Sequence, residues 1–345
     1  MRDYIDFALR CVYNFPMEVD RLLELAERFL EGSVTLEEIR KFPEFSPERV
    51  PFKGNLSRSA LIVSADRPRH LRKVFLRPAD ILIFNLEDGV AEKNKNFARL
   101  LLRKFLLNVP FDGSKEVVVR INPLDSSYSW EDIFEILPTL PHAVRLSKVK
   151  SQKDVVALDG ALTAFEKAYN LPFGTIKIHL SIETASAFEF LEKILTSSPR
   201  VTVAYLGILD LFADLDISQD RIYSSSPLSV HVKSKFVLTC RSLRVIPIAP
   251  AYQNHEDLEG FEKEAFEDKK LGFEGKMCIS VRQVEIANKV FSPSQEEIEE
   301  AKEIVRLYEE ALKEGKGGIT YKGRFIDQPI YRDALNKLRF IEKSD

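Results

Sequence analysis

The sequence predicts an α/β fold: a (β/α)8 TIM barrel with an N-terminal helical extension and a C-terminal helix-hairpin-helix segment. Short runs of Val, Ile and Leu recur along the chain, and a helical stretch follows each of them. Roughly eight such runs occupy about 220 residues, the usual size of this barrel. The runs are apolar on both faces, as the strands of a parallel sheet covered by helices must be.

A helical extension is expected before the barrel, over residues 1–55. Residues 17–30 carry apolar side chains at helical spacing. Thr35 with Glu38 matches a capping box, which predicts a second, short helix. The proline-rich residues 42–51 are expected to connect these helices to the barrel.

The barrel itself is expected over residues 56–293. An open, doubly wound sheet is the alternative, but no Gly-x-Gly-x-x-Gly follows any strand, so the glycine loop of dinucleotide-binding sheets is missing. The predicted strands are Ala60–Ser64, Ile81–Leu86, Glu116–Ile121, Ala143–Val149, Thr175–Ile182, Val201–Leu206, Val245–Ala249 and Lys276–Ile279.

A C-terminal helical segment that could act as a lid is expected over residues 294–345. Ser294 and Glu297 form a capping box that opens a charged amphipathic helix. A small hairpin with Lys322 and Gly323 at its turn follows, and a final helix ends the segment.

Composition excludes several classes of partner. The chain has 50 basic and 53 acidic residues, a formal net charge of −3. No basic excess favours nucleic acid, and no polybasic run favours an anionic membrane surface. The apolar runs are far shorter than a membrane span. We therefore expect neither a nucleic acid nor a membrane as partner.

The cysteines and the start of the chain favour a cytoplasmic location. Cys11, Cys240 and Cys278 are few and far apart, and their spacing matches neither a zinc site nor a disulfide framework. Asp3 and Asp6 interrupt the apolar core that a signal peptide would need. Reduced thiols in the cytoplasm are the simplest interpretation.

Charged residues gather where the predicted strands end. In a (β/α)8 barrel the active site lies at the carboxyl ends of the strands. Buried charges there cost free energy unless they are paired or bound to a ligand. The charged residues at strand ends are Glu87, Asp88, Arg120, Lys148, Glu183 and Asp210.

Glu183 and Asp210 follow neighbouring strands and could face one cation. Two carboxylates with open positions for water and substrate suit Mg²⁺, and no His or Cys ligands for zinc stand near them. Each carboxylate could instead cap the helix that follows its strand. Arg120 and Lys148 could likewise form salt bridges with Glu87 and Asp88.

These residues belong to a longer series of motifs that resembles a known family. The chain is similar to the β subunit of citrate lyase and to malyl-CoA and citramalyl-CoA lyases, grouped as HpcH/HpaI-like aldolases. The resemblance covers about residues 57–340 in order. The matching motifs are Arg58–Val63, Arg67–Arg69, Leu86–Val90, Val119–Leu124, Ser147–Val149, Ile182–Ala185, Asp210–Leu211, Leu271–Ile279, Val290–Ser294 and Phe325–Asp327 with Pro329.

The resemblance implies a metal, a substrate class and an assembly. It makes Glu183 and Asp210 ligands of Mg²⁺, with Mn²⁺ as an alternative ion. The substrate would be a 3-hydroxyacyl thioester, such as citryl-, malyl- or citramalyl-CoA, whose carbon–carbon bond is broken or formed. The partners would then be a keto acid and an acyl thioester of CoA or an acyl carrier. The resemblance also implies a homotrimer or homohexamer.

The resemblance also assigns roles to individual side chains. Arg120 would bind the carboxylate of the keto acid, and Arg67 would lie near the CoA end; with Lys148 they form the expected substrate-binding set. Glu87 and Asp88 would lie near the metal waters and near Arg120. The resemblance implies that Asp327 reaches a neighbouring subunit's site and acts in acid–base catalysis, so we expect Arg120, Asp327, Glu87 and Asp88 to be catalytic.

Three positions depart from the family pattern. Ser64-Ala65-Asp66 replaces a Val-Pro-Gly loop and adds an acid near the presumed CoA path. Leu209 replaces a glutamate, and Ser280-Val281 replaces His-Pro. These departures keep two alternatives open. One is a pyruvate-type aldolase that uses free keto acids without CoA. The other is a non-catalytic barrel that serves as subunit or regulator of a larger complex.

Overall fold

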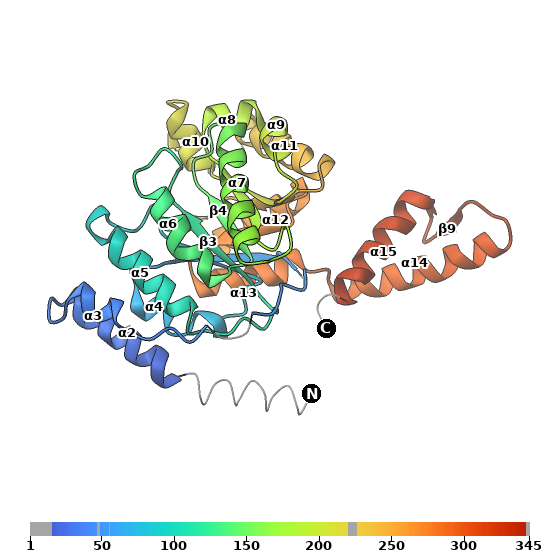
Figure 1. Cartoon of the computed structure of the whole chain (residues 1–345). Helices are drawn as coiled ribbons and strands as arrows, with labels where there is room; N and C mark the ends of the chain where they lie inside the picture. Colours follow the sequence, from blue (N-terminus) through green and yellow to red (C-terminus); the bar gives the residue numbers. More distant parts are fainter. Residues whose placement is uncertain (1–15, 47–48, 55, 220–225, 343–345) are drawn as a thin grey trace.

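A closed barrel of eight parallel strands forms the body of the protein (Figure 1). The structure is a computed structural model, and it describes residues 16–46, 49–54, 56–219 and 226–342. The strands are β1 (Ser59–Ser64), β2 (Ile81–Asn85), β3 (Glu116–Ile121), β4 (Ala143–Leu146), β5 (Lys177–Ile182), β6 (Val201–Leu206), β7 (Ile246–Ala249) and β8 (Gly275–Cys278). Each strand pairs with its sequence neighbour, and β8 pairs with β1. The predicted fold class is confirmed, and closure of the sheet excludes the open alternative.

Apolar side chains fill both sides of this sheet. Inside the barrel, Ile83, Tyr205, Ile248 and Met277 belong to one buried cluster. A larger cluster lies between the outer faces of the strands and the surrounding helices. The continuous apolar runs of the sequence therefore reflect burial on both faces, as predicted.

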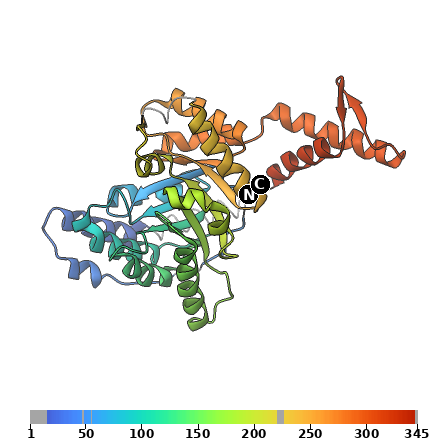
Figure 2. The same cartoon turned by 90° about the horizontal axis from the view of Figure 1, so that it is seen from above.

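Helices cover the barrel between successive strands (Figures 1 and 2). They are α4 (Pro68–Leu71), η1 (Val74–Leu76), η2 (Glu92–Asn94), α5 (Lys95–Leu106), α6 (Ser129–Ile136), η3 (Leu137–Thr139), α7 (Gln152–Ala168), α8 (Ala185–Glu189), α9 (Leu191–Leu195), α10 (Ile208–Asp214), α11 (Pro227–Ser242), α12 (Leu258–Leu271) and α13 (Val281–Phe291). Within the described residues, no helix is long and apolar enough to cross a membrane.

Strand β4 ends earlier than predicted. The apolar pattern suggested a strand to Val149, but the strand stops at Leu146. Lys148 adopts a left-handed backbone conformation with φ 45°, which a strand cannot accommodate. This bend turns the chain at the rim of the barrel, where the Lys148 backbone N–H and side chain both make polar contacts.

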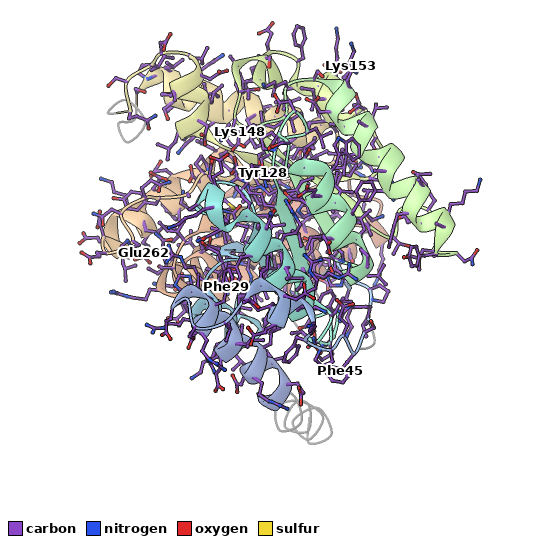
Figure 3. All side chains as sticks on the ribbon, turned by 60° about the vertical axis from the view of Figure 1, so that its left-hand side comes forward. Phe29, Phe45, Tyr128, Lys148, Lys153 and Glu262 are labelled. Atoms are coloured by element: carbon purple, nitrogen blue, oxygen red, sulfur yellow. The ribbon has the colours of Figure 1, made fainter. Side chains whose placement is uncertain are left out.

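Two helices before the barrel pack onto it. Helix α2 (Pro16–Leu30) buries an apolar side, and Phe29 (labelled in Figure 3) stacks on Phe97 of α5 with ring centroids 4.5 Å apart. Helix α3 (Leu36–Arg40) begins at Thr35, whose backbone N–H donates to Glu38 at 2.7 Å. The predicted capping box is therefore present, while Cys11 lies outside the described residues.

The C-terminal segment projects from the barrel as an arm (Figures 1 and 2). It consists of α14 (Gln295–Lys313), β9 (Ile319–Tyr321), β10 (Arg324–Ile326) and α15 (Gln328–Glu342). Ser294 and Glu297 form the predicted capping box. Lys322 and Gly323 form the hairpin turn with φ 47° and 77°, the left-handed values that two-residue hairpins favour. A small apolar cluster holds the arm together, separate from the barrel core.

Candidate active site

A cavity of about 460 Å³ opens at the carboxyl ends of the strands. Its wall includes charged side chains from five elements and apolar groups between them. The lining residues are Ile62, Ser64, Asn85, Asp88, Gly89, Arg120, Arg145, Glu183, Leu206, Gly207, Ile208, Leu209, Asp210, Pro250, Ala251, Gln253, Met277 and Ile279. Four of the six charged strand-end residues that the sequence singled out therefore line one cavity: Asp88, Arg120, Glu183 and Asp210.

Glu183 follows β5 and is held in place by two donors. Its Oε1 accepts from the backbone N–H of Lys148 at 2.7 Å and from Nη2 of Arg120 at 3.2 Å. Gly207 lies directly against it: a Cβ built on Gly207 would come within 2.5 Å of the Glu183 Cβ and 2.6 Å of its Oε2. Only glycine leaves room there for the carboxylate.

Asp210 lies in the first turn of α10 and lines the same cavity. Burial and the negative charge of Glu183 raise the pKa of Asp210. No donor within the described part of the chain hydrogen-bonds to its carboxylate. Neither carboxylate caps a helix: Thr184 caps α8, and Gly207 occupies the cap position of α10. The capping alternative is therefore wrong for both residues.

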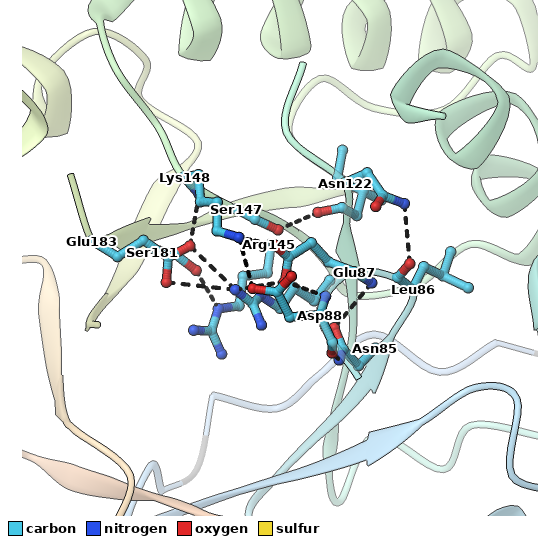
Figure 4. A network of polar contacts seen from close by, with 12 residues as sticks. Asn85, Leu86, Glu87, Asp88, Asn122, Arg145, Ser147, Lys148, Ser181 and Glu183 are labelled. Carbon is cyan, nitrogen blue, oxygen red and sulfur yellow. Dashed lines mark hydrogen bonds and ion pairs between the residues drawn. The ribbon is translucent and has the colours of Figure 1, made fainter. Parts of the chain in front are cut away.

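An ion-pair network joins the ends of β2, β3 and β4 (Figure 4). Arg120 Nη2 lies 2.9 Å from Glu87 Oε2, and Lys148 Nζ lies 2.9 Å from Glu87 Oε1 and 2.7 Å from Asp88 Oδ2. The salt bridges that the sequence suggested among these four residues are therefore formed. The network holds the Arg120 guanidinium at the cavity between Glu87 and Glu183.

The same contacts shift proton affinities. Burial raises the pKa of Glu87 even though Arg120 and Lys148 oppose the shift. Burial also acts to raise the pKa of Asp88, but the hydrogen bonds with Lys148 and Glu87 and the charges of Lys148 and Arg120 together outweigh it, so the pKa of Asp88 is lowered. Asp88 is thus the more acidic carboxylate of the pair and the one that faces the cavity.

Arg120 keeps donors that the protein does not use. Its Nη2 serves Glu87 and Glu183, but the buried Nε has no hydrogen-bond partner among the described residues. Burial opposes the charge, and the surrounding carboxylates more than offset this, so the pKa of Arg120 is raised. A permanently charged guanidinium with unused donors suits an anionic ligand.

Two residues important at the site were missed from the sequence. Arg145 lies inside β4 rather than at its end, and it lines the cavity. Lys95 of α5 donates to the carbonyls of Leu86 and Glu87 and to the side chain of Asn122. A positive charge in an otherwise apolar strand was the available signal for Arg145.

Arg67 and Asp327 do not line this cavity. The Arg67 side chain is 62% exposed and lies 3.6 Å from Asp66 at the start of α4. Asp327 lies between β10 and α15 of the arm, and the arm extends away from the barrel in Figures 1 and 2. Within one chain, Asp327 is therefore remote from the other predicted catalytic residues.

Two of the departures from the family pattern have local structural explanations. Asp66 is buried, and its carboxylate accepts from Ser64 Oγ at 2.8 Å and Asn94 Nδ2 at 3.0 Å. The acid that the sequence placed near the CoA path is therefore hydrogen-bonded inside the protein and is not exposed to solvent. Ser280 caps α13 by accepting from the backbone N–H of Gln283 at 3.3 Å. Leu209 lines the cavity and makes that part of the wall apolar.

A cation at this site would have few protein ligands. Among the described residues, no group of three or more His, Cys, Asp or Glu side chains is arranged to hold a metal ion. A cation between Glu183 and Asp210 would need further ligands from water or substrate. Mg²⁺ commonly binds in this way, through one or two carboxylates and several waters.

Comparison with known proteins assigns the family. Residues 58–281 match the family model described as HpcH/HpaI aldolase/citrate lyase. The chain belongs to this family. It is 33% identical over 278 residues to citrate lyase subunit beta of Haemophilus influenzae, covering 80% of this chain and 93% of that protein. It is 31% identical over 301 residues to L-malyl-CoA/beta-methylmalyl-CoA lyase of Rhodobacter capsulatus, covering 82% and 94%.

A solved structure of the family resembles the barrel. Protein CitE from Mycobacterium tuberculosis, in complex with magnesium, acetoacetate and coenzyme A, is 26% identical with a TM-score of 0.68. The match covers 84% of this chain and 99% of that one. The family resemblance inferred from the motifs is confirmed, and with it the prediction of a carbon–carbon lyase.

Proposed function

We propose that this protein is a Mg²⁺-dependent lyase that cleaves or forms a 3-hydroxyacyl thioester, with a keto acid and an acyl thioester on the other side of the reaction. The observation that carries the proposal is a pair of carboxylates, the buried Glu183 and the half-buried Asp210, in one cavity with Arg120. The relative from Mycobacterium tuberculosis was solved with magnesium, acetoacetate and coenzyme A, which supports the same ligand classes here.

The carboxylate pair fits a hard divalent cation. Asp210 has no hydrogen-bond donor among the described residues, and its raised pKa reflects burial and repulsion from Glu183. A cation bound to both oxygen sets would relieve that repulsion. Mg²⁺ suits the all-oxygen donor set. Mn²⁺ is the alternative ion, and a comparison of the two binding affinities can distinguish them.

Arg120 is the proposed binding residue for the carboxylate of the keto acid. Its guanidinium is 9% exposed, is held by Glu87 and Glu183, and keeps unused donors. A fixed fork of N–H groups recognises a carboxylate bidentately, which also orients the ligand. Lys148 contributes indirectly, because it holds Glu87 and Asp88 in position.

The proposed chemistry follows from these placements. The hydroxyl proton of the substrate leaves, the carbon–carbon bond breaks, and the products are a keto acid and a thioester enolate that is then protonated at carbon. A bound Mg²⁺ would supply Lewis-acid stabilisation of the developing alkoxide. Asp88, ionised and lining the cavity, is the proposed acceptor of the hydroxyl proton. Glu87 helps to hold Arg120 in position.

Asp327 is the proposed acid that protonates the enolate carbon, but only in an assembly. The arm carries it away from its own barrel, so a neighbouring copy must present it. A homotrimer or homohexamer would satisfy this requirement. Arg67, exposed at the start of α4, remains the proposed contact for the CoA end.

Glu183→Gln tests the proposal most directly. The amide keeps an oxygen for Lys148 and Arg120 but loses the charge that holds the cation. We expect Mg²⁺ affinity to collapse and kcat/KM to fall on the order of 10²–10³-fold, as when one electrostatic contact to the transition state is lost. Titration calorimetry with MgCl2 and a turnover assay with malyl-CoA, citramalyl-CoA and citryl-CoA provide the measurements.

Glu189→Gln is the matched control, because Glu189 is an exposed carboxylate of the neighbouring helix α8. It should leave both quantities unchanged. Unchanged metal affinity in Glu183→Gln would contradict the proposal. Turnover of free hydroxy keto acids with no turnover of CoA esters would favour the pyruvate-type aldolase instead.

A further inference from the structure

Arg145 is a buried cation without a carboxylate partner. It projects into the barrel from β4, is 4% exposed, and lines the cavity. Its Nε donates to Ser181 Oγ at 2.8 Å, and its Nη1 lies 3.4 Å from the Met277 sulfur. Its guanidinium carbon stacks 3.9 Å from the centre of the Tyr205 ring. No acidic side chain in the described chain forms an ion pair with it.

These contacts leave the guanidinium under-satisfied. A thioether is a weak acceptor and a hydroxyl is a neutral one, so neither offsets the cost of burying a full charge. The Tyr205 ring offsets part of it. Burial and the nearby Arg120 lower the pKa of Arg145 to about 10, so it is still charged at neutral pH. The protein therefore maintains a positive charge at the cavity with no fixed counter-charge.

Three carboxylates near it are already engaged elsewhere, and Asp210, which lines the same cavity, forms no ion pair with it among the described residues. Glu87 pairs with Arg120 and Lys148, Asp88 pairs with Lys148, and Glu183 pairs with Arg120. None of them forms an ion pair with Arg145. The missing counter-charge must come from the solvent or from a ligand in the cavity.

The position of Arg145 beside Arg120 limits the kind of ligand. The two arginines are register partners on the neighbouring strands β3 and β4. Neighbouring strands lie about 4.8 Å apart, and both side chains reach the same cavity. Two guanidinium groups so placed suit one molecule with two carboxylates separated by one or two carbons.

We propose that Arg145 is a second carboxylate subsite and makes the enzyme selective for 2-oxo-dicarboxylates over 2-oxo-monocarboxylates. This inference rests on the proposed function, in which Arg120 holds the first carboxylate. The second carboxylate accepts from the unused Nη2 of Arg145 and supplies its missing counter-charge. Guanidinium donors are better suited to this task than an ammonium group, because their fork matches both carboxylate oxygens.

The test compares oxaloacetate with pyruvate, which lacks the second carboxylate. Binding to the full chain is measured by calorimetry with saturating MgCl2, for the wild type and for Arg145→Met and Arg145→Lys. A charge-assisted hydrogen bond contributes roughly 10-fold to 100-fold in affinity. We expect the wild type to prefer oxaloacetate by about that factor, Arg145→Met to lose the preference, and pyruvate affinity to fall far less.

Arg145→Lys keeps the charge without the fork and should retain part of the preference. It also keeps the test informative if Arg145→Met does not fold, as judged by thermal denaturation. A wild type that binds both keto acids equally, or a preference that survives in both variants, would overturn the subsite. A wild type that binds Mg²⁺ and neither keto acid would overturn the proposed function, and the subsite with it.

Discussion

The barrel contains charged side chains at both of its ends, but they have ion-pair partners at one end and lack them in part at the other. At the amino end, Arg200 is fully buried before β6 and contacts Glu166 at 2.6 Å and Asp159 at 2.6 Å. Its remaining donors serve Ile176 O and Thr163 Oγ1. At the carboxyl end, the buried Arg145 and the half-buried Asp210 have no charged partner in the described structure.

This difference separates scaffold from site. A buried charge whose hydrogen bonds are all satisfied contributes a fixed geometry and leaves nothing for a ligand. A buried charge with unused donors or acceptors is costly in the free protein, and the cost is recovered only when a ligand binds. Substitutions at the amino end should therefore reduce stability, whereas substitutions at the carboxyl end should reduce binding and turnover.

The largest expected effect on stability comes from breaking the amino-end network. Arg200→Met leaves Glu166 buried with its partner gone and Asp159 without its cation. Removing one partner of a buried ion pair commonly costs about 3–5 kcal/mol. We expect the free energy of unfolding in urea to fall by about that amount, while kcat per folded molecule stays unchanged.

Two further variants sharpen this comparison. Arg200→Lys keeps the charge but cannot reach both Glu166 oxygens, so its loss should be intermediate. Glu183→Gln should show the opposite profile, with activity lost and stability kept, because Arg120 retains its ion pair with Glu87 and the repulsion between Glu183 and Asp210 is removed. If Arg200→Met lowered kcat of the folded enzyme as much as Glu183→Gln does, the division between the two ends would fail.

A smaller effect is expected from crowding the site rather than removing a charge. Gly207→Ala places a methyl group against Glu183, where it would come within 2.5 Å. Overpacking of this kind costs about 1–3 kcal/mol, and here it must displace the carboxylate. We expect weaker Mg²⁺ binding and a roughly 10-fold or larger loss of kcat/KM, measured by the assays used for Glu183→Gln.

Gly160→Ala is the matched control for Gly207→Ala. Gly160 lies inside α7, and a Cβ built there meets nothing within 4 Å. Alanine in a helix interior is favoured over glycine by about 0.5–1 kcal/mol, so this variant should be slightly more stable and fully active. Equal metal affinity in Gly207→Ala and Gly160→Ala would show that Gly207 does not position Glu183.

The sequence predicted the barrel well because its signal is repeated. Eight apolar runs, each bounded by helical stretches, leave few alternatives, and the polar strand ends follow from the rule that barrels bind ligands there. The sequence therefore predicts that Glu183 and Asp210 lie close together, and both line one cavity. Strand ends such as that of β4 were less accurate, since the turn at Lys148 depends on its contacts with Glu183 and Asp88.

What the sequence could not predict is which charges remain unpaired. Arg145 was overlooked because it lies within a strand, and only the register of β3 and β4 shows it beside Arg120. Asp66 was expected to add a negative charge near the ligand path, but its carboxylate is buried and accepts from Asn94, which is distant in sequence. Pairing depends on contacts between distant segments, and a local pattern does not encode them.

The smallest expected effect is on the pH dependence of stability, where the two ends should differ in sign. Burial acts to raise the pKa of Glu166, but hydrogen bonds from Arg200 and two backbone N–H groups outweigh it, so its pKa is lowered below the usual 4.5. Its stabilising contribution is present above that value and is lost as pH falls through the folded-state pKa. Burial raises the pKa of Glu87 above 4.5, so the folded state favours the protonated form.

The free energy of unfolding should therefore be measured from pH 7 down to about 3.5, which spans the carboxylate titrations, in Glu166→Gln, Glu87→Gln and the wild type. As pH falls, the advantage of the wild type over Glu166→Gln should shrink, because protonation of Glu166 removes the ion pair with Arg200 that the variant already lacks. Over the same range the wild type should become more stable relative to Glu87→Gln, because the Glu87 carboxyl becomes protonated and the folded state favours this neutral form. The result would contradict this prediction if both differences in unfolding free energy, wild type minus Glu166→Gln and wild type minus Glu87→Gln, changed in the same direction with pH. The charge on Glu87 would then be stabilised by its partners as fully as the charge on Glu166 is by Arg200.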